Sequence, residues 1–128
     1  MEKKLLVLII EDNEDFQNLY GMVAEQAGFE VESIYDGKSA LARLDEDPLP
    51  AIVLLDSRLP KADGMEILAS ARSRDRWAQV PIYFLTADTR VAKGRGDFMQ
   101  GMEQANGVIE KGAESIHQLR ELFARYRS

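Results

Sequence analysis

Five polar residues stand directly after apolar runs, at places where strands of a parallel sheet would end. They are Glu11, Asp12, Asp56, Thr86 and Lys111. Sites in open parallel sheets form at the carboxyl ends of the strands, so we expect these side chains to meet at one edge. Any single acid could simply cap a helix. Asp56 does not fit that explanation, because Ser-Arg-Leu-Pro follows it instead of a helix start.

Three clustered carboxylates repel one another and need a compensating cation. Each like-charged pair at roughly 4 Å costs about 4 kcal/mol at an effective dielectric constant of about 20. Three carboxylates and the Lys111 ammonium leave a formal charge of −2, which Mg²⁺, an ion that prefers oxygen ligands, would cancel. A carboxylate beside Mg²⁺, an ammonium and a hydroxyl is suited to accept a phosphoryl group.

Three short apolar runs predict strands buried on both faces. They cover residues 5–10, 51–55 and 80–85, and none alternates with polar residues, which is typical of parallel strands. Weaker strand candidates lie at residues 29–35 and 107–110. Apolar residues three and four apart predict helices in the gaps, with stripes in 16–27, 40–44, 65–71 and 116–126. Asp36 is the expected cap of the second helix.

This order of elements predicts a doubly wound α/β protein. Strand and helix alternate five times, and right-handed crossovers then place helices on both faces of one parallel sheet. The fourth helix, within residues 89–106, is expected to be short or loose because three glycines interrupt it. Trp77, in the connection to the fourth strand, is expected to be a partly buried lid.

Length, charge and cysteine content restrict the function further. The 128 residues suffice for one domain with its own core, so we take 1–128 as a single domain. A net charge of −6 argues against direct binding of nucleic acid or membrane. Residues 1–56 carry 13 acids and 4 bases, whereas residues 57–128 carry 9 acids and 12 bases. With no cysteine and no targeting or membrane-spanning run, the chain is expected to be cytoplasmic.

Four motifs at the predicted strand ends give the sequence a resemblance to a known family. They are Ile-Ile-Glu11-Asp12, Leu-Leu-Asp56-Ser-Arg-Leu-Pro60-Lys-Ala-Asp-Gly64, Phe-Leu-Thr86-Ala87 and Lys111. Over its whole length the sequence resembles receiver domains of two-component response regulators, the group that includes the chemotaxis receiver protein. The resemblance implies a five-stranded sheet with the flavodoxin-like strand order 2-1-3-4-5. It also implies a phosphoacceptor that switches partner binding.

The resemblance implies which residues handle the phosphoryl group. Asp56 would receive it from a histidine kinase or a histidine phosphotransfer protein. Thr86 and the amide of Ala87 would hold phosphoryl oxygens, and Lys111 would pair with Asp56 and then with the phosphate. On this reading the chain is not an enzyme with a separate substrate, because it assists only its own phosphorylation and dephosphorylation.

The resemblance also implies a metal site with Mg²⁺ as cofactor. Its ligands would be Glu11, Asp12, Asp56 and the backbone carbonyl of Arg58. In the family, the positions of Arg58 and Asp88 tune the lifetime of the phosphate. Because their charges are opposite, we expect these two residues to pair across the mouth of the site.

Two positions depart from the family pattern. Many receivers carry an aromatic residue three positions before the lysine, and here that residue is Val108. Many also have proline after the lysine, where this chain has Gly112. An aliphatic side chain cannot make the rotamer change of an aromatic one, so we expect output to depend instead on ordering of the loose fourth helix.

Alternative functions stay open at this stage. A phosphohydrolase with an aspartyl nucleophile would need a second Asp two residues after it, and Arg58 stands there. A receiver-like binding module that switches weakly, or not at all, is a second alternative. The chain could also be the receiver part of a larger regulator or hybrid kinase. The output protein or domain is not named by the sequence, and a homodimer stays open as a further assembly.

Overall fold

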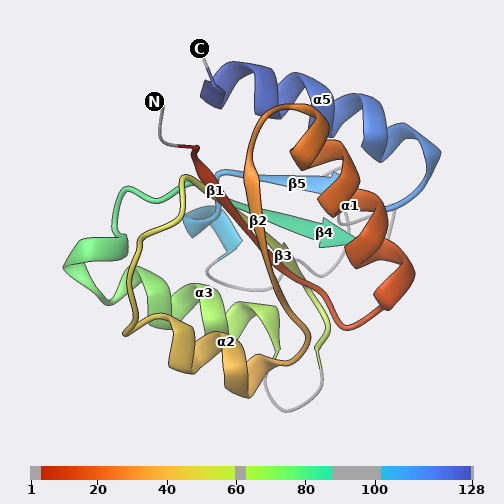
Figure 1. Ribbon diagram of the computed structural model, residues 1–128. Helices are drawn as coiled ribbons and strands as arrows, with labels where there is room; N and C mark the ends of the chain where they lie inside the picture. Colours follow the sequence, from red (N-terminus) through yellow and green to blue (C-terminus); the bar gives the residue numbers. More distant parts are fainter. Residues whose placement is uncertain (1–3, 60–62, 88–101, 128) are drawn as a thin grey trace.

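The computed structural model describes residues 4–59, 63–87 and 102–127 (Figure 1). Within these ranges the strands are β1 (Leu6–Ile10), β2 (Glu30–Ile34), β3 (Ile52–Asp56), β4 (Ile82–Thr86) and β5 (Gly107–Glu110). The α-helices are α1 (Glu14–Gln26), α2 (Gly37–Arg43), α3 (Gly64–Arg72) and α5 (Ala113–Arg127). Two 3-10 helices are η1 (Asp75–Trp77) and η2 (Met102–Gln104).

The described strands form one parallel sheet in the order β2-β1-β3-β4-β5. β3 lies at its centre, and all of its residues are buried, which explains the uninterrupted apolar run. In the register between β3 and β4, Asp56 lies opposite Leu85, so β3 and β4 end almost level. The predicted α/β class and strand order are confirmed. The polar residues at the strand ends therefore share the carboxyl edge.

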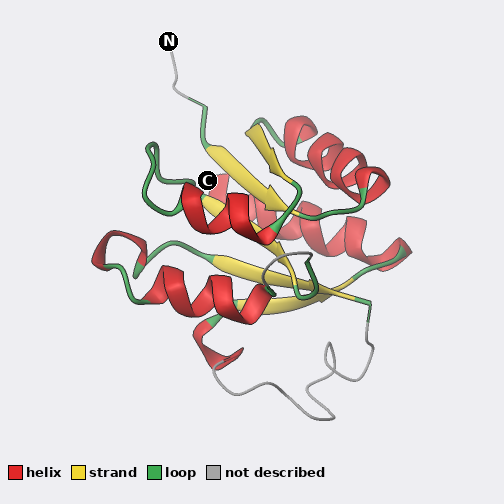
Figure 2. Ribbon diagram, turned by 90° about the horizontal axis from the view of Figure 1, so that it is seen from below, coloured by secondary structure: helices red, strands yellow, loops and turns green. Residues whose placement is uncertain are grey.

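Helices cover both faces of the sheet (Figures 1 and 2). α1 and α5 pack against each other on one face, and α2 and α3 lie together on the other. Successive residues of β1 enter opposite cores: Val7 and Ile9 pack on the α1 and α5 side, and Leu8 and Ile10 on the α2 and α3 side. Burial on both faces holds the sheet rigid, and with it the edge that carries the polar residues.

Side-chain caps set the beginnings of the first three helices. Asn13, Asp36 and Asp63 each accept a hydrogen bond from the backbone N–H three residues later, at 3.0, 2.8 and 2.9 Å. The cap predicted at Asp36 is thus observed. No helix of the described chain combines the length and apolar character that crossing a bilayer requires.

The expected fourth helix cannot be compared in full, since residues 88–101 lie outside the described part of the chain. The described end of that region forms η2. Asn106, just after η2, ties it to the sheet: its N–H donates to the carbonyl of Ile82, and its side-chain oxygen accepts from the Ile82 N–H at 2.9 Å. Arg72 at the end of α3 also donates to this oxygen, at 3.0 Å.

The prediction that Trp77 is a partly buried lid is wrong. Its side chain is only 1% exposed, and its indole Nε1 donates to the carbonyl of Leu44 at 2.8 Å. The three arginines shortly before it in the sequence suggested a surface segment, but the indole packs into the core beneath α2 and α3. Because η1 precedes β4, Trp77 lies toward the amino edge of the sheet. Its fluorescence is therefore a poor probe of events at the carboxyl edge.

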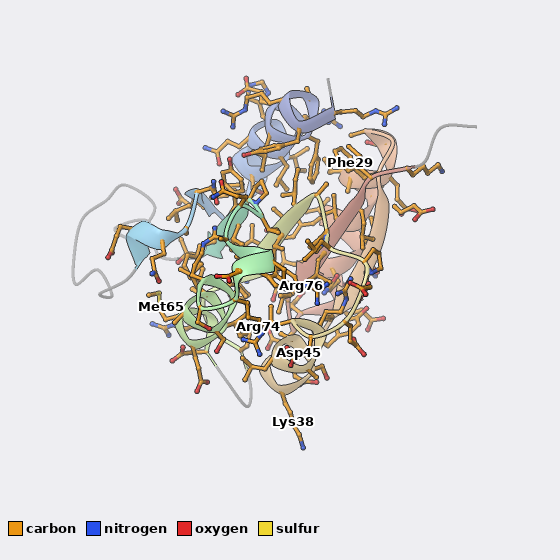
Figure 3. The ribbon with its side chains drawn as sticks, turned by 90° about the vertical axis from the view of Figure 1, so that its left-hand side faces the viewer. Phe29, Lys38, Asp45, Met65, Arg74 and Arg76 are labelled. Atoms are coloured by element: carbon orange, nitrogen blue, oxygen red, sulfur yellow. The ribbon has the colours of Figure 1, made fainter. Side chains whose placement is uncertain are left out.

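Two ion pairs near Trp77 offset part of the charge difference between the two halves of the chain. Arg74 contacts Asp45 at 3.0 Å (Figure 3). Arg76 contacts Asp47 at 2.5 Å. Bases of the second half thereby lie beside acids of the first half. The two acids are largely exposed, so each pair adds little stability.

Candidate functional site

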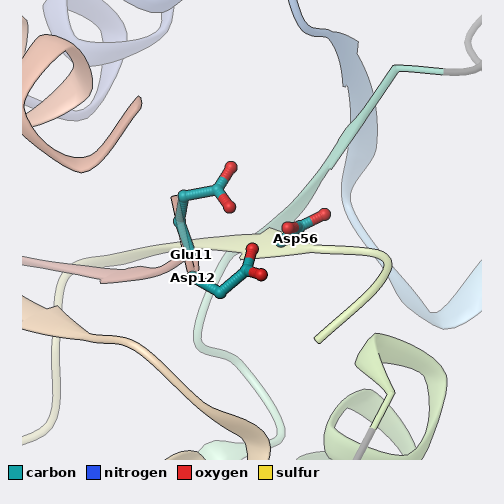
Figure 4. Close-up of side chains that lie close together, drawn as sticks. All are labelled: Glu11, Asp12 and Asp56. Atoms are coloured by element: carbon teal, nitrogen blue, oxygen red, sulfur yellow. The ribbon is translucent and has the colours of Figure 1, made fainter. Parts of the chain in front are cut away.

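The carboxylates of Glu11, Asp12 and Asp56 meet at the carboxyl edge of the sheet (Figure 4). One oxygen atom of each lies within 4.8 Å of the others. Glu11, directly after β1, and Asp56, at the end of β3, are buried, whereas Asp12 is exposed. The cluster therefore has two acids fixed by the sheet and a third that is open to solvent.

Lys111 brings its positive charge to this cluster from the end of β5. Its Nζ lies 2.5 Å from Glu11 Oε1 and 3.2 Å from Asp56 Oδ2. Its backbone N–H donates to the carbonyl of Thr86 at 2.7 Å, which continues the β4–β5 pairing and fixes where the lysine side chain starts. One ammonium between two buried carboxylates neutralises only part of their charge.

Burial and the neighbouring acid both alter the ionisation of Glu11. Burial, followed by its hydrogen bond with Asp56, raises the pKa of the Glu11 carboxyl to about 7 from an ordinary value of 4.5. Hydrogen bonding to Lys111 acts in the opposite direction and is the smaller effect. Near neutral pH the negative charge at this edge is thus held at a free-energy cost, which a cation would relieve.

In front of Asp56 there is a hollow of about 350 Å³. The described residues that line it are Asp56, Ser57, Arg58, Thr86, Ala87 and Lys111. All four residues predicted to handle a phosphoryl group thus border one space. The N–H of Arg58 donates to Asp56 Oδ1 at 3.1 Å, which orients this carboxylate. The expected pair of Arg58 with Asp88 cannot be assessed, because Asp88 lies outside the described residues.

One buried polar residue next to the site was not predicted. Gln17, on α1, is 2% exposed, and its Nε2 donates to the carbonyls of Ile9, Glu11 and Ile34 at 2.8, 3.1 and 2.9 Å. It thus joins the ends of β1 and β2 beneath the acidic pair. A glutamine beside an apolar stripe carries no signal of this role, since its acceptors are backbone atoms.

Substitution of Asp56 by asparagine should raise the melting temperature in the absence of divalent cations, by about 3–6 °C. The change removes one negative charge beside Glu11, while Lys111 keeps its closer contact with Glu11. The asparagine oxygen can still accept from the Arg58 N–H. Thermal unfolding in a metal-chelating buffer measures the effect.

Two comparisons check that interpretation of Asp56→Asn. Mg²⁺ should stabilise the wild type more than the variant, because the variant has lost one carboxylate ligand and a ligand that binds the folded state more tightly stabilises it more. Asp75→Asn, an exposed substitution in η1, should change neither the melting temperature without metal nor the stabilisation by Mg²⁺. A lower melting temperature for Asp56→Asn without metal would show that repulsion does not dominate at this site.

The fold and the site together define a class of protein. A doubly wound parallel sheet whose carboxyl edge carries an acidic cluster, a lysine and a hydroxyl is the architecture of phosphoacceptor signalling domains. The chain belongs to the response regulator receiver domain family, whose model matches residues 7–123. The family accepts phosphoryl groups in two-component signalling, where response regulators work with histidine kinases and output domains. The predicted family and its phosphoacceptor function are confirmed.

Individual relatives agree with this assignment. The chain is 35% identical over 125 residues to the transcriptional regulatory protein TrcR of Mycobacterium tuberculosis, covering 94% of this chain and 43% of TrcR. The chemotaxis response regulator CheY4 of Vibrio cholerae has a similar fold, with a TM-score of 0.81, 24% identity and coverage of 97% and 99% of the two chains.

A second similar structure is the receiver domain of the sensor histidine kinase PA1611 from Pseudomonas aeruginosa, described with a magnesium ion in its active-site cleft. Its TM-score is 0.77 at 23% identity, with coverage of 97% and 98%. The chain spans less than two thirds of the length of the first curated relatives that it matches.

Val108 and Gly112, the two departures from the family pattern, differ in their surroundings. Val108 is partly buried against the core on the α2 and α3 side. Gly112 has a φ of +143°, which a proline, with φ fixed near −65°, cannot adopt. The backbone directly after Lys111 therefore follows a path that requires glycine.

Proposed function

We propose that Asp56 is the residue of this chain that accepts the phosphoryl group. The observation that carries the assignment is its position: of the three clustered carboxylates, Asp56 is the one that lines the hollow shared with Thr86, Ala87 and Lys111. An acceptor oxygen needs free space in front of it for the phosphorus and its three further oxygens. Glu11, fully buried, has no such space.

In the proposed reaction, a carboxylate oxygen of Asp56 attacks the phosphorus of a phosphorylated histidine on a partner protein. An O–P bond forms, the N–P bond breaks, and its electron pair stays on the histidine nitrogen. Lys111, the Thr86 hydroxyl and the N–H of Ala87 donate to the other phosphoryl oxygens. Donors fixed on strand ends stabilise charge in the transition state without reorganising.

We propose Mg²⁺ as the cofactor, because the donors present suit it. Glu11, Asp12 and Asp56 offer hard oxygen atoms within 4.8 Å of one another, and we add the backbone carbonyl of Arg58 as a fourth ligand. Exposure of Asp12 leaves access for the waters that Mg²⁺ retains. The magnesium-containing receiver of PA1611 supports this choice. When bound, the ion supplies positive charge to the transferred group.

We propose that residues 1–128 form a single receiver domain that receives phosphate from a histidine kinase or a histidine phosphotransfer protein. Its output partner is either a separate protein or another part of a longer chain, as the partial coverage of TrcR allows. The net charge of −6 argues against nucleic-acid binding by these residues themselves. We propose no separate enzymatic activity, since Arg58 occupies the position where a phosphohydrolase would carry its acid.

A non-covalent phosphoryl mimic tests the assignment of the site. Fluoroberyllate coordinates a carboxylate oxygen and resembles a tetrahedral phosphoryl group, so wild type should bind it only when Mg²⁺ is present. Amide NMR spectra should show shifts centred on residues 56–58, 86–87 and 111. Asp56→Ala should not respond, whereas Asp75→Asn should respond as wild type does. Binding by Asp56→Ala, or none by wild type, would contradict the proposal.

A further inference from the structure

The first turn of α1 places an aromatic ring against the ammonium of Lys111. Lys111 Nζ lies 4.8 Å from the centroid of the Phe16 ring, over its face. The lysine side chain is only 11% exposed, and within the described part of the chain it forms ion pairs with the carboxylates of Glu11 and Asp56. The ammonium is thus held between two acids on the sheet side and one ring on the helix side.

The ring is itself fixed in place by its neighbours. The N–H of Phe16 donates to the capping oxygen of Asn13 at 3.0 Å, so its backbone position follows from the start of α1. The N–H of Asn13 donates in turn to Glu11 Oε2 at 3.2 Å, which links the cap to the site. The Phe16 ring stacks on Tyr20, with centroids 5.6 Å apart and an interplanar angle of 17°. Tyr20 is fully buried and cannot move aside.

We propose that Phe16 is a positioning residue that holds the Lys111 ammonium beside Asp56 through a cation–π interaction. The ring face attracts a cation by its quadrupole but carries no net charge. A carboxylate in its place would hold Lys111 equally well, yet it would add repulsion against an incoming phosphoryl group. The neutral ring restrains the lysine without competing for it. This inference rests on the proposed function, since it assumes that Lys111 acts on the group carried by Asp56.

Simple packing is the competing explanation, because Phe16 also touches the core on the α1 and α5 side. The two explanations differ in what they require of the ring. Packing needs apolar volume, which leucine largely supplies. A cation–π interaction needs the electron-rich face, which leucine lacks and which fluorine substitution weakens at nearly constant size.

Variants at position 16 separate these explanations. Phe16→Leu should lower the limiting rate of Asp56 phosphorylation by acetyl phosphate with Mg²⁺ about three- to tenfold, the range expected for a partly desolvated cation–π contact. The acetyl phosphate concentration that gives half of this rate should not change. Phe16→Tyr should restore the rate, and fluorinated phenylalanines at position 16 should reduce it progressively. Met22→Leu, an exposed change on the same helix, should have no effect.

A second measurement observes Lys111 directly. NMR relaxation of its side chain in the unphosphorylated protein should show greater mobility in Phe16→Leu and in the fluorinated series. Equal rates and equal mobility across the fluorinated series, with wild type phosphorylated, would overturn the inference. If wild type is not phosphorylated, the proposed function fails, and Lys111 mobility alone then decides whether the ring restrains the lysine.

Discussion

Replacing Lys111 by methionine should lower the rate of Asp56 phosphorylation about 100-fold, the loss typical of removing one preorganised donor from a charge-stabilising site. The ammonium lies 3.2 Å from Asp56 Oδ2. From this position it can stabilise the negative charge of the phosphoryl group as that group is transferred to Asp56. Mg²⁺ affinity should move in the opposite direction and increase, because lysine and the metal compete for the same carboxylates. Phosphorylation kinetics and calorimetric Mg²⁺ titration measure the two effects.

The opposite changes expected in phosphorylation rate and Mg²⁺ affinity distinguish loss of the Lys111 contact from loss of the fold. A misfolded variant would lose both phosphorylation and Mg²⁺ binding. Lys4→Met is the matched control, because Lys4 is exposed before β1 and the net charge changes equally. It should leave both quantities unchanged. An unaltered phosphorylation rate in Lys111→Met would remove the lysine from the proposed mechanism.

Replacing Gly64 by alanine should lower the free energy of unfolding by about 2–3 kcal/mol. A Cβ atom at this first residue of α3 would lie 2.5 Å from the carbonyl oxygen of Asp56 and 2.9 Å from the Phe84 ring. Relieving this contact displaces the backbone at the end of β3, which costs free energy. The Asp56 side chain moves with that backbone. We therefore expect Mg²⁺ affinity and phosphorylation to fall together with stability.

Chemical denaturation and Mg²⁺ titration test the Gly64 prediction. The matched control is Gly21→Ala in α1, where a Cβ would meet only a side-chain methyl of Val31 at an ordinary 3.7 Å. That substitution should be neutral or stabilising by up to about 1 kcal/mol, since alanine favours helix. Equal behaviour of the two variants would show that the close approach of α3 to β3 is not required.

Several features of this molecule could be predicted from sequence because they follow from local patterns. Apolar runs without alternation identified the buried parallel strands, and the residues that follow them identified the edge where Asp56 and Lys111 meet. The sheet then brings these residues together by topology alone. The family motifs added the strand order, which strand–helix alternation leaves undetermined.

Other features depend on tertiary contacts and carried no local signal. Trp77 follows three closely spaced arginines in the sequence, yet its indole enters the core. Gln17 acts through backbone carbonyls of two strands. The sequence places Phe16 only in the apolar stripe of residues 16–27. Its contact with Lys111 depends on how α1 and β5 pack in the fold, which the sequence pattern does not show. Such contacts are set by packing between elements distant in sequence.

Incubation with acetyl phosphate and Mg²⁺, followed by intact-mass measurement and peptide mapping, tests the central claim most directly. Wild type should gain one phosphoryl group, located on Asp56, and should gain none when Mg²⁺ is chelated. Asp56→Asn, shown to be folded by its thermal transition, should gain none under either condition. An unmodified wild type, or a phosphoryl group that persists in Asp56→Asn, would contradict the assignment of Asp56 as the phosphoacceptor.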